Sequence, residues 1–340
     1  MAAHLVRLSA LANGASARIM DASLFAPFAS PVILFFLLGL LASALRSDLA
    51  IPEAMAKGMS LYLMAAIGLK GGVAVAKSGI NGEIAAALAA GLALSFTIPV
   101  LAYALLRGFG QLDQINAGAV AAHYGSVSVV TFVTANEILG AGGLVVAGFM
   151  VAVLAVMETP AILSGLMLAR RGQAGDGHSR GELLREVFLN ASVVLLLGSF
   201  AIGLIAGPKG YAEVQPLFES GFKGVLCLFL LDMGLIAARR LIDARALNLR
   251  LVVLAIAFPL INGTLGVLVG QAIGLDVATA AALGVLCASA SYIAVPAAMR
   301  LALPQADPGI YLTMSLSITF PFNILIGISL FAALSRLLAG

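Results

Sequence analysis

The sequence is poor in charged residues and cysteines, and these scarcities limit the kinds of protein that it can encode. Charged residues make up 10% of its 340 residues and hydrophobic residues 61%, whereas a soluble domain has about 25% charged residues. The composition excludes an ordinary soluble domain and predicts a helical bundle dissolved in lipid. The two cysteines, Cys227 and Cys287, lie in apolar stretches, which favours packing roles over a disulfide or a metal site.

Motifs of enzymes and of nucleic-acid-binding proteins are also absent. The chain has no His-Glu-x-x-His motif, no phosphate-binding glycine loop and no cysteine–histidine cluster. His123 and its neighbouring serines lack an aspartate that could orient a nucleophile. The net charge of +3 comes from loop arginines without interleaved aromatic residues. We therefore expect no enzyme, no catalytic residue, no cofactor and no nucleic-acid partner.

Apolar stretches long enough to cross about 30 Å of hydrocarbon recur along the chain. We predict ten transmembrane helices, near residues 29–45, 51–76, 84–106, 115–139, 144–170, 187–206, 215–239, 250–273, 277–299 and 309–336.

One hydrophilic connection divides these spans five from five. We predict an N-terminal tail at 1–28, a first five-helix repeat at 29–171, a linker at 172–186 and a second repeat at 187–338. An odd number of spans per repeat inverts the second repeat relative to the first. If both termini face outward, most loop arginines lie on the cytoplasmic side of the membrane. This orientation places the linker in the cytoplasm, and we expect the protein in the plasma (inner) membrane.

Two spans carry matching interruptions of small and hydroxyl-bearing residues. Gly118 opens the stretch that reaches Ser126, and Gly284 opens a similar stretch 166 residues later that contains Ser289 and Ser291. We predict that the fourth and ninth helices are discontinuous there, with Pro296 helping to break the ninth. Paired interruptions of this kind point to a transporter site between two repeats.

A broken helix supplies ligands for ions of both signs. The start of its second half presents free N–H groups and a partial positive charge, which suits a small oxyanion. Freed carbonyls, hydroxyls and a nearby carboxylate suit a hard cation such as sodium. Binding both ions together lowers the electrostatic cost of moving either one. The alternative at each serine is a structural role, in which the hydroxyl bonds only to the backbone of its own helix and binds no ion.

Four ionisable residues within the spans need a structural or functional reason. Glu158 could bond a helix end, ligate the cation, carry a proton or stay neutral in the packing. Lys70 and Asp232 could form an ion pair that holds the scaffold. His123, beside the fourth-helix interruption, could line the site, titrate, or bond a carbonyl.

Several segments resemble the sodium-dependent bicarbonate transporter family first described in cyanobacteria. They begin at Pro52, Gly68, Glu158, Met233, Ser289 and Pro304, and the resemblance runs from about residue 29 nearly to the end. It implies an all-α integral membrane protein with ten transmembrane helices in a 5+5 inverted-topology repeat. A gate domain of helices 1, 2, 6 and 7 would face a core domain whose helices 4 and 9 cross.

The resemblance also implies a mechanism and a set of site residues. The core would slide against the gate like an elevator, in a homotrimer joined through the gate domain. The anion site would fall at Gly125, Ser126, Ser128, Ser289 and Ser291. Sodium would share the crossing, with Glu158, Ser128 and Ser291 as ligands.

The chain departs from the cyanobacterial pattern around this site. Tyr292 stands where an aspartate is usual, and His123 stands where small residues are usual, so both join the predicted substrate-binding residues. The linker is much shorter than in the cyanobacterial proteins, which argues against regulation by a PII-like partner through it.

We therefore expect sodium-coupled symport of a small anion, with bicarbonate as the leading substrate. Transport of another organic anion and cation/proton exchange on the same architecture stay open as alternatives. A membrane scaffold or receptor with an inactive site is a third reading.

Overall fold

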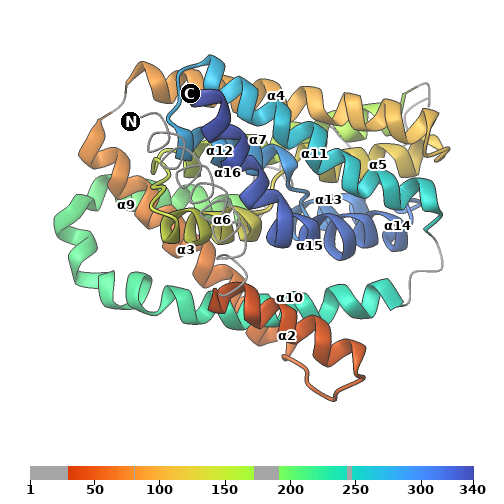
Figure 1. Cartoon of the computed structure of the whole chain (residues 1–340), viewed down its shortest axis with the longest axis horizontal. Coiled ribbons are helices and arrows are strands. Elements are labelled where there is room, and N and C mark those ends of the chain that lie inside the picture. The colour runs from red at the N-terminus through yellow and green to blue at the C-terminus, as the bar shows by residue number, and fades with distance from the viewer. Residues whose placement is uncertain (1–29, 80, 172–190, 243–246) are drawn as a thin grey trace, which may run out of the picture.

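The computed structural model describes residues 30–79, 81–171, 191–242 and 247–340. These residues form helices and connections, with no strand in any of the four ranges. The predicted tail at 1–28 and the predicted linker at 172–186 lie outside the described residues. The fold class is therefore all-α over the part that can be described (Figure 1).

The described part of the first half contains six helical segments. They are α2 (Pro31–Ala44), α3 (Glu53–Ser78), α4 (Gly82–Gly108), α5 (Gln114–Gly125), α6 (Val129–Ala141) and α7 (Met150–Ala169).

The second half follows a similar order. It contains α9 (Ala191–Gln215), η2 (Pro216–Ser220), α10 (Phe222–Ile242), α11 (Leu249–Ala272), α12 (Val277–Ala288) and α13 (Ala294–Ala302). Its last span comprises α14 (Pro308–Leu312), η3 (Thr313–Thr319), α15 (Phe320–Phe322), η4 (Asn323–Gly327) and α16 (Ile328–Ala339), with η marking π-helical turns. Helix α9 bends at Gly207, whose φ is 58°, directly before Pro208.

Seven helical stretches of the described chain are long and apolar enough to cross a membrane, where the sequence predicts ten spans. The three other predicted spans are not among these seven stretches, each for a separate reason. Helix α2 has only 14 described residues, and α12 and α13 are the 12-residue and 9-residue pieces of a broken span. Helix α10 carries Lys223, Asp232, Arg239 and Arg240 within its 21 residues.

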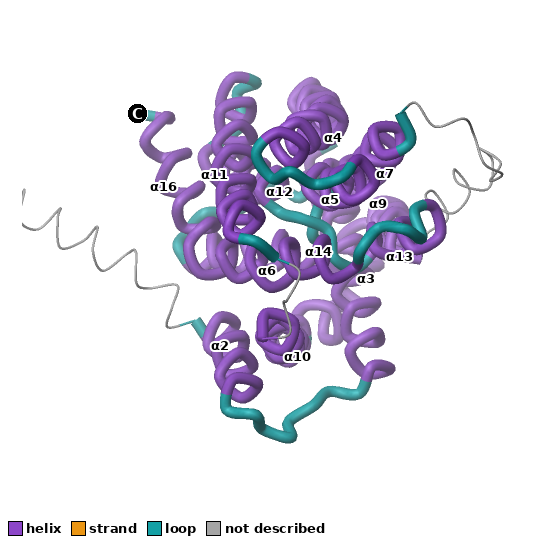
Figure 2. Tube along the Cα trace, turned by 90° about the vertical axis from the view of Figure 1, so that its right-hand side faces the viewer, coloured by secondary structure: helices purple, strands orange, loops and turns teal. Residues whose placement is uncertain are grey.

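Helices from the two halves pair with one another in a four-helix bundle, which we define as α2, α3, α9 and α10. Helix α2 packs along α10, and α3 packs along α9. Glycines allow these close approaches: a Cβ on Gly39 would overlap the carbonyl oxygen of Leu231, and one on Gly72 would overlap that of Phe200. The remaining helices pack around α5, α7 and α12 in a larger bundle, with α2 and α10 lying along its edge (Figures 1 and 2).

The two halves begin corresponding helices with the same caps. Asn81 and Asn248 accept the amides of Ile84 and Leu251 at the starts of α4 and α11. Asp113 and Asp276 each accept two amides at the starts of α5 and α12. Burial opposes ionisation of Asp113, but the hydrogen bonds from Asn116 and Ile115 lower its pKa below the ordinary value. Side-chain caps of this kind satisfy amides that a helix start leaves without a partner.

The glycine contacts predict a sharp difference between two positions of α3. Gly72→Ala should destabilise the protein by about 1–3 kcal/mol because the three atoms nearest the new methyl group are backbone atoms of α9. Gly58→Ala in the same helix meets nothing within 4 Å, and should be neutral or stabilising by up to about 1 kcal/mol. Thermal unfolding in detergent compares them, and equal melting temperatures would contradict the tight α3–α9 packing.

Candidate functional site

The first interruption separates α5 from α6 over three residues. Helix α5 ends at Gly125, Ser126 is extended with φ −82° and ψ 171°, and α6 begins at Val129. Ser128 caps the new helix, because its Oγ accepts the amide of Thr131 at 3.2 Å. A Cβ on Gly125 would overlap the ring of Pro99 in α4. The chain therefore breaks where a glycine and two serines permit close packing and capping.

The second interruption separates α12 from α13 over five residues. Ser289 is extended with φ −78° and ψ 161°, and α13 begins at Ala294 without a side-chain cap. Pro296 is the third residue of α13. The prediction that Pro296 helps to break this helix is wrong, since a proline in the first turn replaces an amide that has no helical partner. The break precedes it, at Ser289 to Ile293.

The two interruptions satisfy each other's backbone groups. The amide of Ser128 donates to Ser289 Oγ at 2.9 Å, and the amide of Ser291 donates to the carbonyl oxygen of His123 at 2.9 Å. Ser289 Oγ in turn donates to the carbonyl oxygen of Leu286 at 2.8 Å. Four buried polar groups from opposite halves of the chain thus hold the breaks in contact.

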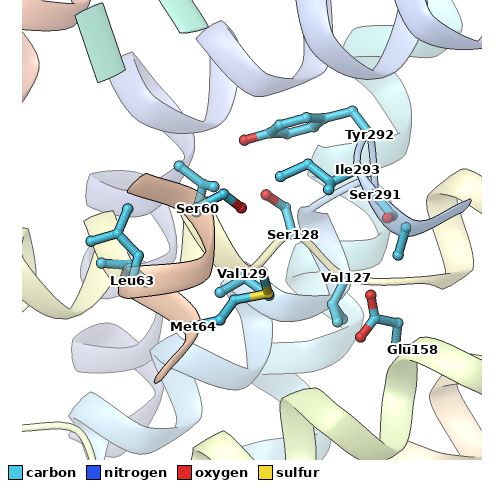
Figure 3. A pocket seen from close by; sticks show the side chains of 13 residues that line it. Ser60, Leu63, Met64, Val127, Ser128, Val129, Glu158, Ser291, Tyr292 and Ile293 are labelled. Atoms are coloured by element: carbon cyan, nitrogen blue, oxygen red, sulfur yellow. The ribbon is translucent and has the colours of Figure 1, made fainter. Parts of the chain in front are cut away.

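A small cavity of about 20 Å³ lies where the interruptions meet α3 and α7. Its polar lining comes from Ser60 of α3, Ser128, Ser291, Tyr292 and Glu158 of α7. In Figure 3 the Ser60 and Ser128 hydroxyls face each other, the Tyr292 ring lies on one side of them, and Glu158 lies on the other. A volume of this size holds about one water-sized particle.

Polar atoms in and beside this cavity have no partner within the described ranges. They include Glu158 Oε2, the Tyr292 hydroxyl and Ser126 Oγ, and the three side chains are 2%, 8% and 1% exposed. A buried polar group without a partner costs about 1–3 kcal/mol, so each of these atoms favours a bound ligand or ion. A carboxylate and several hydroxyls around one space can meet a small ion on several sides.

The structure separates the predicted site residues into two groups. Ser128, Ser291, Tyr292 and Glu158 line the cavity, so the three predicted sodium ligands lie around one space. Gly125, Ser126, Ser289 and His123 do not line it. Gly125 packs on Pro99, and Ser289 and His123 accept the amides that join the interruptions. Their contacts give these residues a positioning role, and Ser126 ends α5 with a buried hydroxyl.

His123 is fully buried. Its Nδ1 donates to the carbonyl oxygen of Ala119 at 2.7 Å, since a carbonyl can only accept. Its ring stacks on Tyr311 with the ring centroids 4.5 Å apart, and its Nε2 has no partner in the described chain. These contacts favour a structural role for His123, in which its ring bonds a backbone carbonyl, over lining the site or titrating.

The predicted ion pair between Lys70 and Asp232 does not form. The Lys70 ammonium lies over the ring of Phe222, 4.7 Å from its centroid. Asp232 is 4% exposed, and its Oδ2 has no hydrogen-bond partner in the four described ranges. Sequence position alone does not show which side chains meet, and the packing places Lys70 over Phe222 instead.

Sequence reasoning missed the contribution of α3. Ser60, Leu63 and Met64 line the cavity, although α3 is an unbroken helix. A serine within an apolar helix was the available signal, and it gave no indication of which face meets the interruptions.

Any cation held here would depend mainly on neutral oxygens. The described residues contain no group of three or more histidine, cysteine, aspartate or glutamate side chains that could hold a metal ion. One carboxylate with hydroxyl and carbonyl oxygens suits a weakly bound hard cation better than a transition metal.

Comparison with known proteins identifies one family. The family model of the Na⁺-dependent bicarbonate transporter superfamily matches residues 31–336. A search of curated proteins gives no match to this chain.

The bond between the interruptions can be tested with two equally buried serines. Ser289→Ala should destabilise the protein by about 1–3 kcal/mol, because the buried Ser128 amide loses its acceptor. Ser315→Ala removes a hydroxyl that bonds only to the preceding turn of its own segment, and should change stability by less than about 1 kcal/mol. Denaturant unfolding measures both, and a smaller loss for Ser289→Ala would contradict the bridging role.

Proposed function

Because the chain belongs to the Na⁺-dependent bicarbonate transporter superfamily, we propose that it carries bicarbonate across a cell's inner membrane in symport with sodium. Family membership makes it a multi-pass membrane transporter rather than an enzyme. The observation that carries the proposal is the pair of hydrogen-bonded helix interruptions beside a cavity with a buried carboxyl group.

The anion would bind at the starts of α6 and α13. The first amides of α6 are those of Val129 and Val130, and the first amide of α13 is that of Ala294. None of the three has a hydrogen-bond partner in the described chain. Each helix start carries about half a positive charge. The hydroxyls of Ser128, Ser291 and Tyr292 add donors around the same space. These groups suit a small planar oxyanion such as bicarbonate.

Sodium would bind beside the anion, with Glu158, Ser128 and Ser291 as ligands. All three side chains line the cavity, and Glu158 Oε2 has no partner among the described residues. Hard cations prefer oxygen ligands. The carboxylate charge would be offset by the cation, and the cation by the anion, so the loaded site would be nearly neutral.

Transport would require the larger bundle to move relative to the four-helix bundle. The cavity of about 20 Å³ is too small for a bicarbonate ion with a sodium ion, since one water already needs about 10–15 Å³ by the same measure. Leu63 and Met64 of α3 border it, so separation of α3 from the interruptions would open it. This geometry supports an elevator motion in which α2, α3, α9 and α10 form the gate.

The wider architecture follows from the same proposal. Matching caps at the starts of α4 and α11, and of α5 and α12, support an inverted five-plus-five repeat with ten spans. We further propose that the chain forms a homotrimer through the gate and that both termini face outward. A PII-like regulator is not part of the proposal.

Uptake into proteoliposomes tests the function itself. An inward sodium gradient should accelerate uptake of labelled bicarbonate, and replacing sodium with potassium should remove the acceleration. Glu158→Gln should lower the apparent sodium affinity by about tenfold or more, because it removes the ligand charge. Uptake driven by a proton gradient alone would favour exchange, and uptake of another anion in place of bicarbonate would identify a different cargo.

A charge introduced at Ser291 tests the anion site. At an effective dielectric constant of about 20, two negative charges about 4 Å apart repel by about 4 kcal/mol. Ser291→Asp should therefore weaken bicarbonate binding by at least about 100-fold. Ser291→Asn is the matched control, because an asparagine side chain has the same shape as an aspartate side chain but no charge. It should weaken bicarbonate binding much less. Calorimetry that found equal affinities in the two variants would move the anion away from Ser291.

A further inference from the structure

A second and larger cavity, of about 440 Å³, adjoins the proposed substrate site. We call it the vestibule; its walls come from α3, α6, the connection before α7 and the start of α10. Val133 of α6 lines both the vestibule and the small cavity. The two cavities therefore share Val133 as part of their walls.

Three ionisable side chains line the vestibule, and two of them have partners. Glu137 of α6 forms an ion pair with Lys223 of α10, with 2.9 Å between Oε2 and Nζ. Asp276 caps α12, and accepts the amides of Ala278 and Thr279 at 2.8 and 3.0 Å. The negative charges in the vestibule are thus already balanced by a cation or by a helix start.

Lys70 of α3 is the third, and it has no counter-ion within the described chain. Its ammonium group lies 4.7 Å from the centroid of the Phe222 ring, and Phe222 lines the vestibule as well. A cation–π contact orients a lysine but leaves its net charge in place. A charged side chain within a membrane helix is costly and usually serves a pathway or a ligand.

We propose that Lys70 forms a first binding site in the vestibule for the transported oxyanion, before the anion reaches the helix interruptions. This inference rests on the proposed function, because it assumes that the anion enters the small cavity past Val133. The single positive charge in a low-dielectric cleft raises the local concentration of small anions. The Phe222 ring orients the Lys70 ammonium beside the vestibule, so this group is preorganised for binding an anion.

The vestibule belongs to one end of the bundle. Lys70 lies in the last third of α3, Glu137 lies in the last turns of α6, and Asp276 directly precedes α12. Lys70 therefore acts on anions that arrive from the face of the membrane where α3 ends. Anions that leave through the opposite face do not meet it.

Transport kinetics in oriented proteoliposomes test this inference. Lys70→Gln should raise the KM for bicarbonate presented at the vestibule face by about tenfold, the lower end of the effect of a focusing charge. The maximal rate and the sodium dependence should be unchanged, and Lys70→Arg should restore most of the affinity. Lys77→Gln is the matched control, because Lys77 lies on the same helix, is exposed and does not line the vestibule. Equal KM values for the Lys70→Gln and Lys77→Gln variants would overturn the proposal.

A second measurement does not depend on transport. Acetylation of Lys70 in the purified wild-type protein, followed by mass spectrometry, should slow several-fold when sodium bicarbonate replaces sodium chloride at equal ionic strength. Acetylation of Lys77 should be unchanged. Protection of Lys70 without any transport would support the vestibule site and refute the proposed function. Transport without protection would support the function and refute the vestibule site.

Discussion

The structure depends on the requirement that every backbone polar group in lipid finds a partner inside the protein. A break in a helix exposes such groups, and each unpaired one costs several kcal/mol. Here the two broken spans meet, and each satisfies part of the other: the Ser128 amide bonds Ser289 Oγ, and the Ser291 amide bonds the His123 carbonyl. Neither break would be stable alone. The contact that makes them possible also places hydroxyls, free amides and Glu158 around one small space.

The same requirement explains a polar chain that joins α5, α11 and the last span. Pro259 has no amide hydrogen, so the carbonyl of Ala255, four residues earlier, has no helical donor. Thr319 Oγ1 donates to that carbonyl at 2.6 Å, and Tyr124 therefore donates its hydroxyl hydrogen to Thr319 Oγ1 at 2.7 Å. Thr319 ends a π-helical turn, a local widening that often accompanies functional sites in helices. Tyr124 lies directly before Gly125, so this chain anchors the end of α5.

The sequence was sufficient to predict the interruptions but not their partners. Small residues and hydroxyls within an apolar span show where a helix can break, and the family resemblance is confirmed over residues 31–336. Ser289 and Ser291 both lie in the non-helical stretch between α12 and α13, so helical periodicity does not tell which of them lines the cavity. Pro296 was misread because its effect depends on its place relative to the helix start. The contribution of α3 and the separation of Lys70 from Asp232 arise from packing between distant segments, which one sequence does not encode locally.

The two interruptions differ in a way that bears on how the site works. Helix α6 begins with a complete cap, because Ser128 holds the Thr131 amide. Helix α13 begins at Ala294, the preceding Ile293 provides no side-chain cap, and Ser291 Oγ accepts the Val295 amide only at 3.4 Å. The start of α6 keeps two open amides, those of Val129 and Val130, whereas α13 keeps that of Ala294 because Pro296 has no amide hydrogen. The start of α13 lies instead beside the unpartnered hydroxyl of Tyr292. An oxyanion would therefore meet mainly backbone donors from α6 and a side-chain hydroxyl from the α13 side.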